Sequence, residues 1–273
     1  ASSHWSSIMQ LLKGQPTYDS TASPGSDFLS QLEVNYGPVG LLGRFFLRAN
    51  SEVRARGLTL HFAPIKELVE TNEANRDSWL PLLPIFDHRD FKPTPDNFFC
   101  IVARDPKGRI VGTHACRLFD WTGTNFHEEA TSLRLFYEDP ERMRRPGEKC
   151  EVTAPSAKTV TGLTVFSGAA WYHPDYRGRG LSRILPHIGK AYALTQWPAE
   201  TIVSIMAEEI HQRGFAKRFG YTNVDWAVHL TNSVVGTRRV AFLSVKRDET
   251  FHLIAEYLAD SFEIDIGVLG GHA

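Results

Sequence analysis

The feature that most constrains the fold of this chain is a strand, a glycine-rich turn and a helix in direct succession. Apolar residues dominate positions 162–172, which predicts a long strand. Residues 181–194 carry apolar side chains at helical spacing, which predicts a helix. The turn between them reads Arg177-Gly178-Arg179-Gly180-Leu181-Ser182. A strand that leads into a helix through so short a turn is typical of α/β architecture.

The rest of the chain continues this alternation of strands and helices. Further strands are predicted at residues 58–62, 98–103, 110–116, 201–207, 224–230 and 239–245. Helices are predicted at residues 38–56, from 64 onward, and at 127–137, 211–219 and 250–260. The order predicts an α/β (α+β) fold with a mixed sheet.

The glycine-rich turn has the properties of an anion site. Gly178 and Gly180 allow backbone angles closed to other residues and let a ligand approach closely. N–H groups at the start of a helix lack partners within the helix, and the helix dipole favours an anion there. Arg177, Arg179 and Arg183 add positive charge. The turn therefore suits a pyrophosphate, although so short a pattern is equally typical of a tight turn with solvated arginines.

The surroundings of the turn decide between these two interpretations. Ala170-Trp171-Tyr172-His173-Pro174 precedes it, and Phe215-Ala216-Lys217-Arg218-Phe219-Gly220-Tyr221 follows it downstream. Over residues 160–230 the chain resembles the GNAT superfamily of N-acetyltransferases. The signature Q/R-x-x-G-x-G/A of that family follows a strand, and a later helix ends in a Gly-aromatic pair. Ser182 stands where the family prefers Gly or Ala.

The resemblance implies a mixed, mostly antiparallel central sheet flanked by helices, in which the strand before the loop splays from its neighbour in a V. Acetyl-CoA would be the cosubstrate, with its pantetheine arm along that strand and its pyrophosphate on the loop. An amine would attack the thioester directly in a ternary complex, with one strand N–H facing the thioester oxygen. The implied CoA-binding residues are Ala170, Trp171, Tyr172, Arg177, Gly178, Arg179, Gly180, Leu181, Ser182 and Arg183.

The acid that protonates the leaving thiolate is not at its usual place. The family often uses a Tyr four residues ahead of the glycine of the Gly-aromatic pair, and this position is Ala216. Either Tyr221, Tyr172 or another hydroxyl replaces it, or the thiolate leaves without help.

A base is expected as well, because an alkylamine has a pKa near ~10.4. Glu208 or Glu209, at the end of the strand that follows the loop helix, is our first choice. Both are equally consistent with solvated residues at a helix start, and His173 and His114 are rival bases.

The resemblance divides the chain into residues 1–56 as an N-terminal arm and extra helix, 57–247 as the acyltransferase domain, and 248–273 as a C-terminal helix and tail. Residues 120–158 form an insertion in that domain. The acceptor is a small-molecule or peptide amine, and a homodimer is possible. Two alternatives remain open: a non-catalytic protein that binds or senses acyl-CoA, and a transferase with a longer acyl donor, for which Ala169 and Ala170 leave room.

Composition excludes several other classes. The formal net charge of -1 provides no field for nucleic acid or an anionic membrane. No apolar run approaches the roughly 18 residues of a membrane span, and the first residues lack the pattern of a secretory signal. Three scattered cysteines predict free thiols in a reducing, cytoplasmic setting. Among the histidines only His88-Arg89-Asp90 is a tight cluster, so no metal is expected.

Overall fold

The computed structural model describes residues 27–270, except for the side chains of residues 261–270. Residues 1–26, most of the predicted arm, lie outside this range. The strands are β1 (Thr59–Phe62), β2 (Phe98–Arg104), β3 (Ile110–Trp121), β4 (Lys149–Val152), β5 (Gly162–Tyr172), β6 (Thr201–Ala207), β7 (Asn223–Ser233) and β8 (Gly236–Lys246). The helices are α2 (Val39–Ala55), α3 (Ile65–Ala74), α4 (Phe126–Thr131), α5 (Pro140–Met143), α6 (Leu185–Gln196), α7 (Glu208–Gln212), α8 (Phe215–Arg218) and α9 (Arg247–Gly270).

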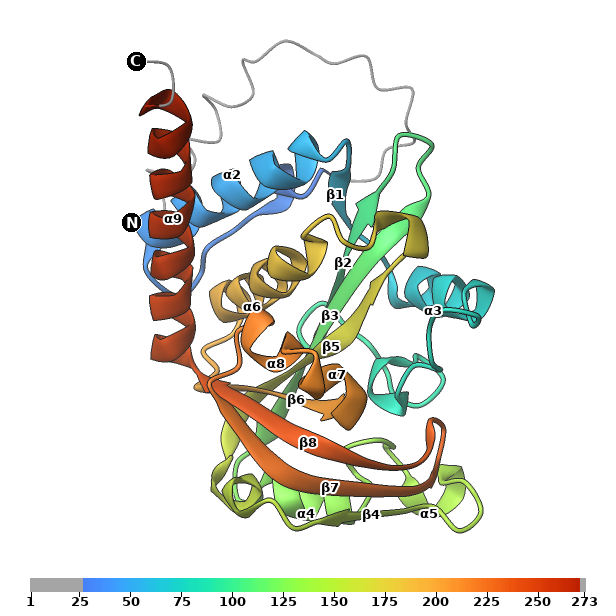
Figure 1. Ribbon diagram of the computed structural model, residues 1–273. Coiled ribbons are helices and arrows are strands. Elements are labelled where there is room, and N and C mark those ends of the chain that lie inside the picture. The colour runs from blue at the N-terminus through green and yellow to red at the C-terminus, as the bar shows by residue number, and fades with distance from the viewer. Residues whose placement is uncertain (1–26, 271–273) are drawn as a thin grey trace.

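All the strands belong to one 8-stranded sheet in the order β1-β2-β3-β5-β6-β8-β7-β4 (Figure 1). The pair β5–β6 is parallel, and the other neighbouring pairs are antiparallel. The crossover between the two parallel strands is the glycine-rich turn followed by α6. The predicted mixed and mostly antiparallel sheet is therefore confirmed.

β5 and β6 pair only over their first residues, from Thr164↔Thr201 to Phe166↔Val203. Beyond that point β5 remains bonded to β3, and β6 remains bonded to β8 up to Ala207. A bulge in the β3–β5 ladder, where Ala169 has φ 50, bends β5 at the point of separation. The two halves of the sheet thus diverge in a V, as predicted.

Both faces of the sheet are covered, as the alternation along β2 shows. Phe99 and Ile101 belong to one buried cluster, whereas Phe98 and Cys100 belong to a second. The first cluster lies beneath α2, α6 and α9. The second includes residues of α3, α4 and the segment before β2. In Figure 1, α9 stands beside α2 and α6, while α4 and α5 gather near β7 and β4.

The helix predicted from residue 181 begins later. Residues Leu181–Arg183 form a 3-10 turn, and α6 starts at Leu185. Pro186 accounts for the difference, because proline has no N–H to donate and is tolerated only in the first turn of a helix.

Two other segments also differ from the sequence prediction. The helix predicted at 211–219 is two short helices, α7 and α8, separated by Gly214 in the left-handed region at φ 78. The predicted helix at 127–137 is shorter, because the chain leaves helical geometry at Leu133, where φ is 64. The insertion adds β4, which extends the sheet by pairing with β7. No helix within the described residues has the length and apolarity of a membrane span.

Candidate active site

The turn after β5 presents a row of unused N–H groups. Gly178 and Gly180 have φ 75 and φ 82, in the left-handed region that glycine tolerates. Among the described residues, no hydrogen bond uses the N–H of residues 178–182. A Cβ added at Gly178 would meet no atom within 4 Å. An open backbone turn with unsatisfied donors is a site for an anion.

The arginines of the turn have different environments. The side chain of Arg177 donates to the carbonyl of Tyr172 at 3.0 Å and to that of Ser78 at 3.2 Å. It therefore ties the end of β5 to the segment before β2 instead of pointing freely at a ligand. The guanidinium of Arg179 lies 4.7 Å from the ring centroid of Tyr176, and Arg183 is exposed.

A further cation at the turn is Arg56, which directly follows α2. Arg56 donates from Nε to the carbonyl of Arg179 at 2.7 Å, and its Nη2 lies 3.2 Å from the point where a Cβ of Gly180 would be. Sequence reasoning missed this residue, because 123 positions separate it from Arg179 and nothing in its local pattern distinguishes it.

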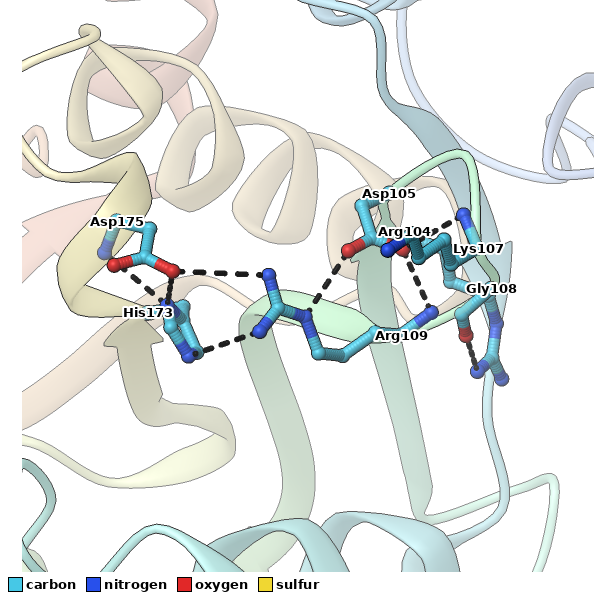
Figure 2. Close-up of polar contacts among 7 residues, drawn as sticks. All are labelled: Arg104, Asp105, Lys107, Gly108, Arg109, His173 and Asp175. Carbon is cyan, nitrogen blue, oxygen red and sulfur yellow. Dashed lines mark hydrogen bonds and ion pairs between the residues drawn. The ribbon is translucent and has the colours of Figure 1, made fainter.

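An ion-pair network anchors the start of the turn to the β2–β3 hairpin (Figure 2). Arg109 donates to Asp105 at 3.0 Å and lies 3.9 Å from the carboxylate of Asp175. His173 accepts a hydrogen bond from the N–H of Asp175 at 3.1 Å. The His173 side chain is engaged at this hairpin and does not line the cavity described next, which argues against it as a base.

A cavity of about 230 Å³ occupies the V between the diverging strands. One wall is residues 166–170 of β5, and the facing wall is residues 204–207 of β6. Residues 79–83 and Phe86 close it on one side, and Val235, Arg238 and Val240 of the β7–β8 hairpin line another part. The cavity therefore touches both buried clusters and passes between the two faces of the sheet.

The predicted pantetheine strand contributes to this cavity unequally. Ala170 lines it. Trp171 turns to stack on Trp79 at 4.9 Å and donates from Nε1 to Ser78 at 3.2 Å. The hydroxyl of Tyr172 is buried without a partner in the described part of the chain and does not line the cavity, so Tyr172 is poorly placed to act as an acid.

A cluster of hydroxyl groups lies at the inner end of the cavity. The Tyr221 hydroxyl is within hydrogen-bonding reach of Ser167 and Ser204. His114 Nε2 lies 2.6 Å from the Ser167 hydroxyl. All four residues line the cavity, and burial raises the pKa of Tyr221 above its ordinary value. Tyr221 therefore faces the V with its proton retained, as an acid requires.

A buried ammonium lies behind this cluster. Lys190 of α6 donates to the carbonyl of Phe219, and its Nζ lies 4.2 Å from the ring centroid of Tyr221. Burial lowers the pKa of Lys190 to about 7. The same burial, with the Lys190 charge as a second cause, holds the pKa of His114 well below its ordinary value.

Comparison with known proteins adds solved structures only, since no family model and no curated protein matches the chain. A mutant of spermidine N-acetyltransferase from Vibrio cholerae is 11% identical, with a TM-score of 0.43 over 71% of this chain and 96% of that one. A dodecameric form of the Vibrio cholerae enzyme is 10% identical, with a TM-score of 0.43 over the same shares. A protein from Klebsiella pneumoniae described as an acyl-CoA N-acyltransferase is 15% identical, with a TM-score of 0.38 over 69% and 97%.

These alignments are loose, and the substrate of each enzyme is a property of that enzyme alone. The splayed pair β5–β6, followed directly by the glycine turn and α6, is present in this chain itself. The chain has a GNAT-type fold.

In this GNAT-type fold, the position at which the family often has a tyrosine acid is occupied by Ala216, which has no proton to donate. Ala216 is buried in α8 and does not line the cavity, and its carbonyl accepts from the N–H of Tyr221 at 3.1 Å. Tyr221 occupies the V from the other side of Gly220. Ser167, Ser204 and Lys190 were missed by sequence reasoning, because isolated polar residues in apolar segments give no signal of where they converge.

The carboxylates expected to supply a base lie at the surface of this GNAT-type fold. Glu209 accepts from Arg238 at 3.0 Å, and Glu208 lies 3.8 Å from Arg239. Their side chains are 65% and 49% exposed, and neither lines the cavity. Both lie in the first turn of α7, where the helix dipole stabilises carboxylates.

Proposed function

We propose that this chain is an acyl-CoA-dependent N-acyltransferase that transfers an acetyl group from acetyl-CoA to an amine. The observation that carries the proposal is that β5 links two sites: its residues 166–170 line the cavity in the V, and the turn that follows it has unused N–H groups at residues 178–182. A thioester and a pyrophosphate are parts of the same ligand and need two such sites joined by one strand.

Each part of the site has a role in this reaction. The N–H groups of residues 178–182 bind the pyrophosphate, with positive charge from Arg179, Arg183 and Arg56. The edge of β5 from Ala170 to Tyr172, which β6 does not pair with, accompanies the pantetheine. The amine nitrogen bonds to the thioester carbon, the C–S bond breaks, and the thiolate takes a proton from Tyr221. The proton that the attached nitrogen loses as the amide forms then restores the phenol of Tyr221.

The first test distinguishes a loss of acetyl-CoA binding caused by the glycine turn from a loss caused by backbone strain in general. Gly178→Val places a β-branched residue in the left-handed region, where it costs roughly 1–2 kcal/mol, and removes the turn geometry that orients the donors. We expect acetyl-CoA affinity, measured by calorimetry, to fall at least about tenfold, because each hydrogen bond to a charged group contributes roughly 1.5–3 kcal/mol.

Gly123→Val is the matched control. Gly123 has φ 79 and, like Gly178, no atom within 4 Å of an added Cβ, but it lies in the turn after β3. We expect it to lose similar stability and to retain acetyl-CoA affinity. Equal affinities of the two variants would contradict the loop assignment.

The second test separates an enzyme from a protein that only binds acyl-CoA. Free thiol is followed with acetyl-CoA and a panel of primary amines. Thiol release that depends on the amine supports transfer. Tight acetyl-CoA binding without release on any amine would support the non-catalytic alternative.

A further inference from the structure

The cavity in the V has no negative charge in its lining. Among the described residues that line it, none is an aspartate or a glutamate. The single charged side chain is Arg238, which donates to Glu209 at 3.0 Å and to the carbonyl of Val235 at 2.7 Å. A cation that entered this cavity would meet Arg238, which is already paired with Glu209, and no carboxylate among the described lining residues. An unpaired charge in an apolar site is strongly disfavoured.

Apart from Arg238 and the polar cluster at its inner end, the cavity is lined mainly by apolar residues and has the size of a small organic group. Leu82, Phe86, Phe166 and Val240 are buried residues of its wall. Its volume of about 230 Å³ exceeds the roughly 150 Å³ of an apolar protein cavity that holds a benzene molecule. An aromatic ring or a branched alkyl group therefore fits inside.

The cavity reaches solvent at a part of its lining that does not belong to the glycine turn. Leu80 lines the cavity and is 50% exposed, so the cavity reaches solvent beside the segment before β2. No residue of 178–182 belongs to the lining. A second substrate can therefore enter without passing the loop that we assign to acyl-CoA.

We infer that the acyl acceptor is an apolar monoamine, with an aromatic or branched aliphatic body, and that the cavity binds it as the uncharged amine. This inference rests on the proposed function. The apolar body of the amine packs against the apolar wall of the cavity. The nitrogen lies toward the part of the V where the thioester carbon would be.

Desolvation replaces a general base in this scheme. Burial disfavours an ammonium ion and lowers its pKa by up to roughly 3–5 units. Lys190 shows the effect within this same core, where burial brings its pKa to about 7. An alkylammonium would leave its proton in solvent on entry and present a lone pair to the thioester. Attack then needs no carboxylate in the cavity.

The groups around the cavity leave the amine as the source of any pH dependence that differs between acceptors. From β3, His114 has a pKa held well below its ordinary value by burial. After α8, Tyr221 has a pKa raised above its ordinary value by burial. Arg238 of β8 forms an ion pair with Glu209 of α7 at 3.0 Å. Lys190 of α6 lies behind Tyr221, and burial lowers its pKa to about 7. Because Lys190 does not line the cavity, we expect it to add the same inflection for every acceptor.

The test compares acceptors with acetyl-CoA as donor. We expect kcat/KM for 2-phenylethylamine and 3-methylbutylamine to exceed that for spermidine by at least about 100-fold, because unpaired polar groups in a mismatched site cost factors of this order or more. The logarithm of kcat/KM should rise with pH up to the pKa of the amine. The inflection should move to lower pH with a fluorinated analogue of weaker basicity.

A pair of variants tests the role of missing negative charge. Leu80→Glu places a carboxylate at the mouth, and Leu47→Glu places one on α2 at a residue of similar partial exposure, 37%. We expect Leu80→Glu to raise the ratio of spermidine to 2-phenylethylamine turnover about threefold or more, the size of an exposed ion pair. Leu47→Glu should leave the ratio unchanged.

Several results would overturn the inference, and they differ from failure of the proposed function. Preference of the unaltered protein for spermidine would overturn the inference alone. Absence of any inflection that moves with the basicity of the amine would indicate a base on the protein, with Glu208 and Glu209 the first residues to change. If kcat/KM with methylamine as acceptor were greater for hexanoyl-CoA than for acetyl-CoA, the cavity would bind the acyl chain and not the acceptor. Absence of transfer to every amine would overturn the proposed function itself.

Discussion

In the proposed reaction, the hydroxyl of Tyr221 is the proton donor to the departing thiolate. It lies in the V beside Ser167 and Ser204, and burial keeps its pKa above the ordinary value. The proton therefore stays on the oxygen through the neutral range and is available for donation.

Tyr221→Phe removes this proton donor while the ring remains. We expect kcat for thiol release to fall on the order of 10²-fold, the lower range of general acid catalysis. The affinity for acetyl-CoA should change little, because the loop is untouched. Steady-state kinetics and calorimetry measure the two quantities.

Tyr192→Phe is the control for this change. Tyr192 packs in the core on Phe62 and Phe99, with ring centroids 4.8 Å and 4.7 Å away, and does not line the cavity. Its kcat should equal that of the unaltered protein. A Tyr221→Phe variant as fast as Tyr192→Phe would show that the thiolate leaves without an acid from Tyr221.

At the scale of elements, the approach of α6 to β3 depends on Gly189. A Cβ at this position would lie 2.3 Å from Cδ2 of His114, whose side chain is fully enclosed. The closeness of helix and strand is what brings Lys190 behind the V, so the spacing of two elements sets the surroundings of Tyr221.

Gly189→Ala should therefore destabilise the fold by roughly 1–3 kcal/mol, the cost of overpacking a core. Gly40→Ala is the opposite case, because Gly40 of α2 is exposed and has no atom within 4 Å of an added Cβ. We expect it to stabilise by up to about 1 kcal/mol through helix propensity. Urea unfolding measures both, and equal signs would contradict the packing argument.

At the scale of the whole molecule, buried bases set the response to acid. His187 lies where α6, α8 and α9 meet: it donates to the carbonyl of Arg218 at 3.0 Å, and its ring centroid is 6.1 Å from that of Tyr257. Burial lowers the pKa of His187 to about 4. Because the folded pKa lies below the unfolded value near ~6.5, the unfolded chain takes up protons first as pH falls.

The free energy of unfolding should thus be highest above about pH 6.5 and decline from there toward pH 4. His187→Gln keeps a donor for the Arg218 carbonyl and removes the titration. We expect the loss of stability between pH 7 and pH 5 to shrink by about 1–2 kcal/mol in this variant. Urea titrations at the two pH values measure it. His114 has the same sign, so part of the decline should persist.

Elements with strong local patterns were predictable without tertiary structure. The ranges predicted for β5 and β6 match those of the structure, because runs of apolar residues bounded by turn residues depend only on neighbours along the chain. The glycine turn between strand and helix was predictable for the same reason. Where the local pattern was broken by Pro186 or Gly214, the predicted helix boundaries were wrong.

The contents of the site were decided by contacts between distant segments. His114 and Ser167 are 53 positions apart in sequence. They meet because the register of β3 against β5 places Cys116, two residues after His114, opposite Ser167. Arg177 donates to the carbonyl of Ser78, and Glu209 accepts from Arg238. Neither contact could be predicted from local sequence, because the partners are far apart along the chain. The sequence by itself determined the alternating elements and the glycine-rich turn between β5 and α6, since both follow from short-range periodicity and glycine. Only the tertiary structure decided which side chains share the V and that, within the described part of the chain, no carboxylate is among them, because strand register and packing bring those residues together.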